Sequence, residues 1–237
     1  MRLLLASAII GVTAAIVAAA GLAGPAHAET RTYNFTGFKR IEASAAFTIE
    51  FTQSPTYSVV VDSKYNTLDK IIIEKIGDTL RITRPKNTNI KGKVEDIVRI
   101  FAPDLDALDL DAAIKFSAPS LNIDNLAIDA DAAVTIDIAN LKANLITINA
   151  DAATKLTLSG SCTKLDATLD AASKITADTL KCRETHIDAR TASSAHVFAS
   201  DKAIARAGTA STINVSGNPR DFQESHDRYG AKVSRTD

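Results

Sequence analysis

Aromatic side chains are scarce in this chain of 237 residues. They make up 5% of the sequence, and neither Tyr nor Trp occurs between positions 105 and 217. Sites that process polysaccharides usually present aromatic side chains to the substrate. The scarcity argues against a carbohydrate-active enzyme of the polysaccharide lyase or glycosidase type, which is the alternative to a non-enzymatic binding or structural protein.

An excess of positive charge is also lacking. Lys and Arg number 27 and Asp and Glu 28, which leaves a net charge of −1 with His neutral. Proteins that bind nucleic acid or anionic lipid usually carry a clear basic excess or a basic patch. We therefore expect no nucleic-acid partner.

Motifs of metal-dependent and nucleophilic catalysis are missing as well. His186, His196 and His226 form no closely spaced pair with a carboxylate, as a metallohydrolase requires. Ser159-Gly160-Ser161 does not fit the Gly-x-Ser-x-Gly pattern of a nucleophile elbow. We predict no catalytic residues, with His196 facing outward and His226 in a C-terminal tail.

The first 28 residues have the organisation of an export signal. Arg2 precedes an apolar run from Leu3 to Ala23, and Ala26-His27-Ala28 fits a small-residue cleavage site. The alternative is an uncleaved membrane anchor, because the apolar run approaches spanning length. Cleavage predicts an exported bacterial protein that is periplasmic, secreted or on the cell surface, with no stable membrane span.

Residues 105–217 contain six copies of one short sequence motif. The copies read LDLDAAIKF, IDADAAVTI, INADAATKL, ATLDAASKI, IDARTASSA and ARAGTASTI. Their fourth residues are 20, 20, 19, 20 and 18 positions apart, a period typical of a solenoid. Within a copy, apolar residues alternate with polar ones, which indicates strands. The repeat therefore predicts a parallel β-helix with coils of about 20 residues.

Coils stacked in register place equivalent residues in columns. Three columns are predicted to face inward: Leu108/Ile128/Ile148/Ala167/Ile187/Ala205, Ala112/Ala132/Ala152/Ala171/Thr191/Thr209 and Phe116/Ile136/Leu156/Ile175/Ala195/Ile213. A fourth, Ile114/Val134/Thr154/Ser173/Ser193/Ser211, becomes polar toward the C-terminus. Either its hydroxyls bond to backbone groups inside the stack, or the last coils are narrower and wetter.

Two neighbouring outward columns are acidic and form the candidate ligand surface, made of Asp109, Asp111, Asp129, Asp131, Asp151 and Asp170. Carboxylates in adjacent coils, about 4.8 Å apart, repel by roughly 1 kcal/mol in bulk water and about 3–4 kcal/mol at a protein surface. Lys115, Lys155 and Lys174 are expected on the same face, where they would offset part of this repulsion.

Four interpretations of the acidic columns stay open. Calcium bound at Asp111, Asp131 and Asp151 would offset more of the repulsion, because Ca²⁺ takes six to eight oxygen ligands. The columns could instead be a solvated acidic face or mark a repeated bend. In a glycosidase, Asp109 and Asp111 would flank the scissile bond.

Cys162 and Cys182 are the only cysteines, and each stands eight residues before the fourth residue of its copy. They therefore occupy equivalent places one coil apart, within disulfide range. In an oxidising compartment we expect a disulfide, and the alternative is a pair of stacked thiols.

The ends of the exported chain lack the 20-residue copies. Residues 29–104 are strand-rich, with one long strand predicted from Ile41 to Phe51, and they form either the first coils or a cap. Residues 29–217 are expected to be a single domain. After Gly217-Asn218-Pro219, residues 218–237 are predicted to be a polar tail or a short cover.

The segments FKRIEASAAFTIEFTQ, YSVVVDSKYNTLDKIIIEKIGDTLRIT and VRIFAPDLDALDLDAA, in this order, resemble the head GIN domain family of auto-transporter adhesins, a domain of unknown function. The resemblance covers Tyr33 to Gly217 and implies a right-handed β-helix. It also implies an adhesin-like or structural role. We expect the outward columns to bind a cell-envelope or extracellular macromolecule, such as a glycan. Here Asp-Ala-Ala and Thr-Ala-Ser stand at bends where many members have Gly, which leaves the bend geometry open because Ala avoids positive φ.

Overall fold

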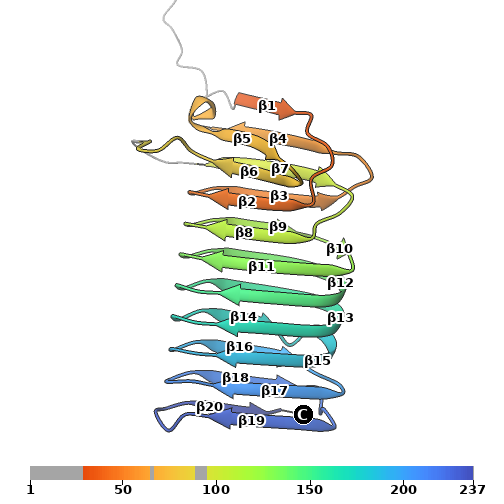
Figure 1. Ribbon diagram of the computed structural model, residues 1–237, viewed down its shortest axis with the longest axis vertical. Helices are drawn as coiled ribbons and strands as arrows, with labels where there is room; N and C mark the ends of the chain where they lie inside the picture. The colour runs from red at the N-terminus through yellow and green to blue at the C-terminus, as the bar shows by residue number, and fades with distance from the viewer. Residues whose placement is uncertain (1–28, 65–66, 89–94, 237) are drawn as a thin grey trace, which may run out of the picture.

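The protein is a single β-solenoid, seen in a computed structural model that describes residues 29–64, 67–88 and 95–236 (Figure 1). The predicted export signal, residues 1–28, lies outside this part of the chain. The described residues contain no α-helix, only a 3-10 turn at Leu68–Lys70. No helix in those ranges has the length and apolar character needed to cross a membrane. The predicted parallel β-helix is confirmed.

Each coil contributes a strand to two long sides of the solenoid, which we call the first and the second sheet. The first sheet stacks β5 (Ile72–Ile76), β6 (Thr79–Thr83), β2 (Arg40–Ser44), β8 (Ala107–Asp111), β11 (Asn125–Asp131), residues 145–150 of β12 (Thr135–Ala150), 164–169 of β13 (Lys155–Leu169), 184–189 of β15 (Leu180–Ala189), β17 (Lys202–Ala207) and β19 (Asp221–His226). The second sheet stacks β1 (Glu29–Tyr33), β4 (Ser58–Ser63), β7 (Asp96–Ala102), β3 (Thr48–Gln53), β9 (Lys115–Ala118), residues 135–138 of β12, 155–158 of β13, β14 (Lys174–Ala177), β16 (Ser194–Phe198), β18 (Thr212–Ser216) and β20 (Lys232–Arg235).

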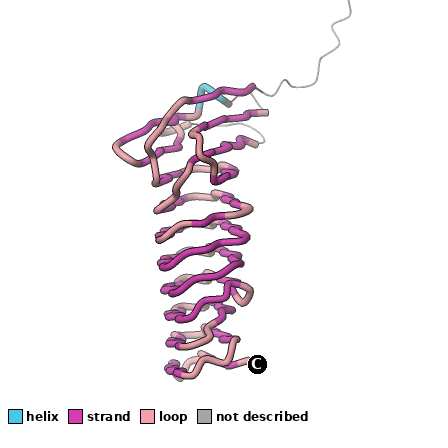
Figure 2. Tube along the Cα trace, turned by 90° about the vertical axis from the view of Figure 1, so that its right-hand side faces the viewer, coloured by secondary structure: helices cyan, strands magenta, loops and turns pink. Residues whose placement is uncertain are grey.

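A short third side closes the coils. It lies opposite the tight bend that joins the first sheet to the second, for example at Ala132 and Ala133. It pairs β10 (Leu121–Asn122) with residues 141–142 of β12, which in turn pair with 160–161 of β13 and then 180–181 of β15. Figure 2, turned by 90°, shows the coils lying one above another along the whole molecule. Neighbouring coils thus bury their apolar side chains against each other, as the repeat predicts.

Two of the predicted inward columns are confirmed. Every residue of the columns that begin with Leu108 and Phe116 is at most 2% exposed. The hydroxyl column is also buried, and its side chains bond to the backbone. Thr154 Oγ1 donates to the Asp151 carbonyl at 2.7 Å, and Ser211 Oγ accepts from the Ser193 N–H at 3.1 Å. No buried side-chain nitrogen or oxygen of the described residues lacks a partner.

The predicted inward column of Ala and Thr is wrong, because these residues form the tight bend between the two sheets. In the first four repeats both Ala residues of the bend have positive φ, for example 58° at Ala132 and 68° at Ala133. In the last two repeats only the second residue does, since a β-branched Thr stands first. The second Ala donates its N–H to the bend of the next coil, as Ala133 does to the Ala152 carbonyl at 2.9 Å.

The N-terminal part is both first coils and cap, and it is not stacked in chain order. The strands β2 and β3 lie between β6 and β7 on one side and β8 and β9 on the other. Beyond them, β5, β4 and β1 add antiparallel and cover the end of the stack (Figure 1). The predicted long strand from Ile41 to Phe51 is wrong, because a bend at Ala45 with φ 85° divides it into β2 and β3.

The C-terminal residues cover the other end rather than forming a free tail. The strands β19 and β20 pair in parallel with β17 and β18 and make a last coil. His226, predicted in the tail, is the last residue of β19. This coil is polar because only one of its sides packs on another coil, so its side chains are mostly exposed.

Candidate functional site

The six predicted surface carboxylates lie on the outer side of the first sheet. Asp109 pairs in register with Asp129, and Asp111 with Asp131. In the next coils, Asp151 and Asp170 continue the second of these columns through backbone hydrogen bonds to residues 130 and 150. Five of the six are exposed and Asp170 is half-buried. The structure therefore brings all six onto one outward surface along the first sheet, which we call the acidic face.

Two of these residues also stabilise the bends. Oδ1 of Asp151 accepts the N–H of Ala152 at 2.7 Å, and Oδ1 of Asp170 accepts the N–H of Ala171 at 2.8 Å. Short polar side chains with an oxygen acceptor are suited to such local bonds. Asp at this position thus marks a repeated bend as well as a charged surface.

The acidic face is electrostatically unfavourable in itself. The pKa of Asp109 is raised above its usual value by partial burial and then by the neighbouring charges of Asp129, Glu42 and Asp111, against a lowering by Arg40. None of the six carboxylates forms an ion pair with the residues that the structure describes. The face therefore carries negative charge that no direct ion pair within the described residues neutralises.

The prediction that lysines share this face is wrong. Lys115, Lys155 and Lys174 follow the tight bend and lie on the second sheet, where their side chains are exposed. The bend directs the two strands of a coil to opposite sides of the molecule. Hence the lysines cannot neutralise the acidic face by direct pairing.

The predicted calcium site has no preformed cage in the described ranges. No group of three or more His, Cys, Asp or Glu side chains there is placed to hold a metal ion. Asp111, Asp131 and Asp151 follow one another along the stack instead of converging on one point. Calcium binding at these residues stays a prediction.

The three histidines that follow the predicted export signal are separated. On the first sheet, His186 lies between Asp166, with Nδ1 3.7 Å from the carboxylate, and Arg206, which is 2.9 Å from Nε2. On the second sheet, His196 faces outward as predicted and contacts Asn214 at 3.3 Å. Gly160 is not part of a nucleophile elbow, because it lies in β13 where a Cβ would collide with the backbone of Leu141.

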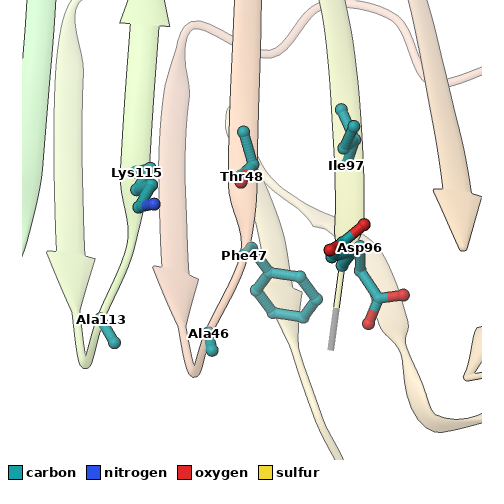
Figure 3. A pocket seen from close by; sticks show the side chains of 8 residues that line it. Ala46, Phe47, Thr48, Asp96, Ile97, Ala113 and Lys115 are labelled. Atoms are coloured by element: carbon teal, nitrogen blue, oxygen red, sulfur yellow. The ribbon is translucent and has the colours of Figure 1, made fainter. Parts of the chain in front are cut away.

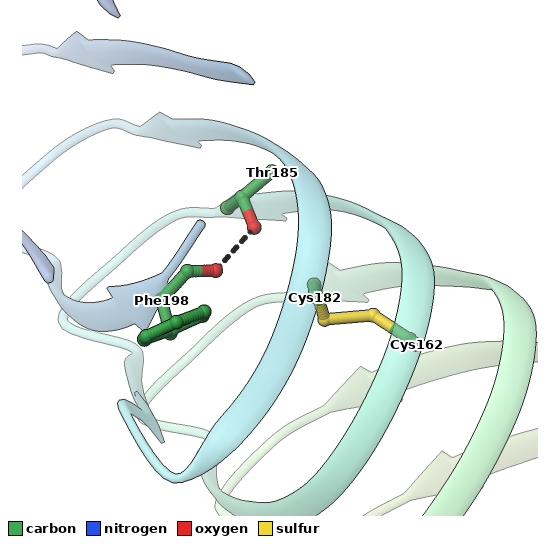
Figure 4. Close-up of a disulfide and its surroundings, with 4 residues drawn as sticks. All are labelled: Cys162, Cys182, Thr185 and Phe198. Atoms are coloured by element: carbon green, nitrogen blue, oxygen red, sulfur yellow. Dashed lines mark hydrogen bonds between the residues drawn. A yellow bond between two sulfur atoms is a disulfide. The ribbon is translucent and has the colours of Figure 1, made fainter. Parts of the chain in front are cut away.

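The two cysteines are joined by a disulfide across adjacent coils (Figure 4). Their Cα atoms are 4.4 Å apart, and the two residues pair directly in β13 and β15. The bond ties the coil that contains β13 to the next one on the third side of the solenoid. It lies away from the acidic face and therefore has a structural role.

A pocket of about 420 Å³ at the bend edge was not found from the sequence (Figure 3). It is lined by Ala46, Phe47, Thr48, Glu95, Asp96, Ile97, Ala113 and Lys115. Beside it, the fully buried Asp96 pairs with Arg84, whose guanidinium lies 4.5 Å from the centre of the Phe47 ring. These residues come from three distant segments, so no local pattern could have indicated the pocket.

The stacked coils define a β-solenoid protein with a long acidic face. Its sequence belongs to the family described as putative auto-transporter adhesin, head GIN domain, whose model matches residues 37–219. The resemblance seen in the sequence is thereby confirmed. A comparison with curated proteins gives no match.

Solved structures share the fold. A putative adhesin from Bacteroides fragilis has a TM-score of 0.85 at 18% identity, covering 89% of this chain and 97% of that one. A putative adhesin from Parabacteroides distasonis has a TM-score of 0.72 at 17% identity, covering 90% and 98%. A putative lipid binding protein from the same species has a TM-score of 0.66 at 14% identity, covering 89% and 97%. At these identities the likeness shows the fold alone.

Proposed function

We propose that the protein is an exported, non-enzymatic adhesin-like module that binds a macromolecule of the cell envelope or the extracellular space. Its binding surface is the acidic face, and the partner supplies positive charge, directly or through bound cations, together with hydroxyl groups such as those of a glycan. The protein acts in the periplasm or at the cell surface. Membership of an adhesin family supports this role.

The observation that carries the proposal is the arrangement of the six carboxylates. They stack from coil to coil, none of them forms an ion pair with the described residues, and the pKa of Asp109 is raised partly by its acidic neighbours. A partner that brings positive charge to this face relieves the repulsion between adjacent coils. The binding free energy therefore grows with the number of coils that the partner contacts.

The test is a screen of the purified protein on an array of glycans and envelope components, with calcium and with chelator. We expect binding that is lost in the Asp131→Asn/Asp151→Asn variant, because Asn keeps the shape and the oxygen acceptor but removes the charge. Asp178→Asn, which changes an exposed carboxylate in the turn between β14 and β15, is the matched control and keeps binding. Binding that survives the double substitution would refute the acidic face as the site.

A carbohydrate-active enzyme is the second candidate because of one observation. A general acid in glycoside hydrolysis needs a raised pKa, and Asp109 has one while Asp111 shares its strand. The test is release of reducing ends from polysaccharides by the purified protein and by Asp109→Asn. Activity lost in the variant would replace the adhesin proposal, and absence of activity in both leaves adhesion as the function.

A further inference from the structure

Acidic and basic residues occur together in the coils, on the two sides of the tight bend. The acidic position is the last outward residue of the first sheet, and the basic position is the first outward residue of the second sheet. Four coils carry both charges: Asp111 with Lys115, Asp151 with Lys155, Asp170 with Lys174, and Asp227 with Lys232. In the two coils where the acid is replaced by Arg190 or Gly208, the basic position holds Ser194 or Thr212. The coil of Asp131, with Thr135, is the exception.

This matching is not explained by contacts within the molecule. The paired residues lie on opposite outer faces, and among the described residues neither Asp151 nor Lys155, nor the equivalent residues of the other three coils, form an ion pair. Each column also repels itself, since Lys155 and Lys174 are direct neighbours across adjacent strands. The basic column thus lacks a partner, as the acidic one does.

The geometry of the solenoid supplies a partner in a second copy. Both columns run beside the same bend edge, one on each outer side, and both have the spacing of the coils, about 4.8 Å. Shifting a copy perpendicular to the sheets, without rotation, therefore places the acidic column of one molecule over the basic column of the next. Each acid in the four matched coils then meets the Lys of the equivalent coil, and Arg190 meets Ser194 instead of a cation.

We propose that this protein associates laterally with further copies of itself, first sheet against second sheet, through these two columns. The interface is heterologous, because it joins two different surfaces of the same molecule. Such an interface does not close by symmetry and so continues into rows of molecules. This inference goes beyond the proposed function, since it concerns the second sheet as well as the acidic face.

The experiment is sedimentation velocity of the purified protein over a range of concentrations at low salt. We expect the mean mass to rise with concentration and to fall again at about 0.5 M salt, where exposed charges are screened. Lys155→Glu/Lys174→Glu weakens association at least about tenfold, because two attractive pairs become repulsive. A Lys86→Glu/Lys142→Glu control changes the charge equally outside the column and associates like the natural protein.

A complementary variant makes the test specific. Asp151→Arg/Asp170→Arg reverses the charge of the acidic column. It also removes the Oδ1 bonds to the N–H groups of Ala152 and Ala171, so its circular dichroism spectrum is first compared with that of the natural protein. Alone it does not associate, since both of its columns are basic, but mixing it with Lys155→Glu/Lys174→Glu restores association. A natural protein that stays monomeric at low salt would overturn the proposal, because the two columns would then not attract each other between molecules. An unchanged Lys155→Glu/Lys174→Glu variant, or a mixture that stays monomeric, would do the same.

The two proposals fail separately. The Lys155→Glu/Lys174→Glu substitutions lie on the second sheet and leave the acidic face intact, so this variant keeps any binding seen on the array. Loss of association with retained array binding is the expected result. Association without array binding would refute only the adhesin proposal.

Discussion

The second Ala of each tight bend limits the stability of the solenoid, and replacing it by Gly should raise that stability. Ala133 has φ 68°, a left-handed conformation that costs a non-Gly residue roughly 1–2 kcal/mol. Gly removes this cost but loses about 0.5–1 kcal/mol of additional backbone entropy on folding. The methyl group of Ala133 is exposed and contributes no burial. The hydrogen bond from the N–H of residue 133 to the Ala152 carbonyl is retained in a Gly variant. We therefore expect a gain of about 0.5–1 kcal/mol per bend.

Three substitutions in alternate coils make the effect measurable. Ala113, Ala153 and Ala192 all have positive φ and are exposed. Bends two coils apart are separated by about 10 Å, so their contributions should add. The triple Gly variant should then gain about 1.5–3 kcal/mol, or roughly 3–12 °C in Tm for a chain of this size.

The assay is thermal unfolding followed by far-ultraviolet circular dichroism. The matched control is Ala127→Gly, an exposed position within β11 without positive φ, which should lose about 0.5–1 kcal/mol. If the triple variant melts below the natural protein, as the control does, the left-handed conformation does not carry the cost assigned to it and the reasoning is refuted.

Three further predictions concern stability. Replacing Cys162 and Cys182 by Ser opens a cross-link over 20 residues and should lower the free energy of unfolding by about 3 kcal/mol in urea titrations; a loss under about 1 kcal/mol would contradict this. Arg84→Ala leaves the buried carboxylate of Asp96 without its cation and should cost about 3–5 kcal/mol; an unchanged urea midpoint would contradict this. The raised pKa of Asp109 means that its ionised form opposes folding, so stability should rise as pH falls through the folded-state pKa toward the usual 3.8. Asp109→Asn should therefore raise Tm at pH 7 and not at pH 3, and an equal effect at both values would exclude this cause.

The regular coils were predictable because their signals are local and repeated. The alternation that starts at Leu108 recurs in every copy, so strand direction, two of the three inward columns and the pairing of Cys162 with Cys182 followed from counting. The same alternation hid the bend at Ala45. A two-residue bend keeps the inward and outward parity of its flanking strands, so Ile41 to Phe51 reads as one continuous strand.

The positions of the acidic and basic side chains show most clearly where prediction from sequence spacing fails. Asp111 and Lys115 are four positions apart, which on one strand means the same face, but the intervening bend places them on opposite sides of the molecule. The alternation of apolar and polar residues does not indicate how sharply the backbone turns between two strands. The prediction of a shared face was therefore wrong, although the outward orientation of both residues was right.

The sequence by itself determined the solenoid, the length of its coils, the buried columns that begin with Leu108 and Phe116 and the row of carboxylates, because each of these depends on residues one coil apart or less. Only the tertiary structure decided which coil lies next to which in the N-terminal part, where β2 and β3 lie between strands that follow them in the chain. It alone also decided that Arg84 meets Asp96 beside a pocket and that acids and lysines face opposite ways. These features depend on packing between distant segments and on the angle of a bend, and neither is encoded in a local pattern of apolar and polar residues.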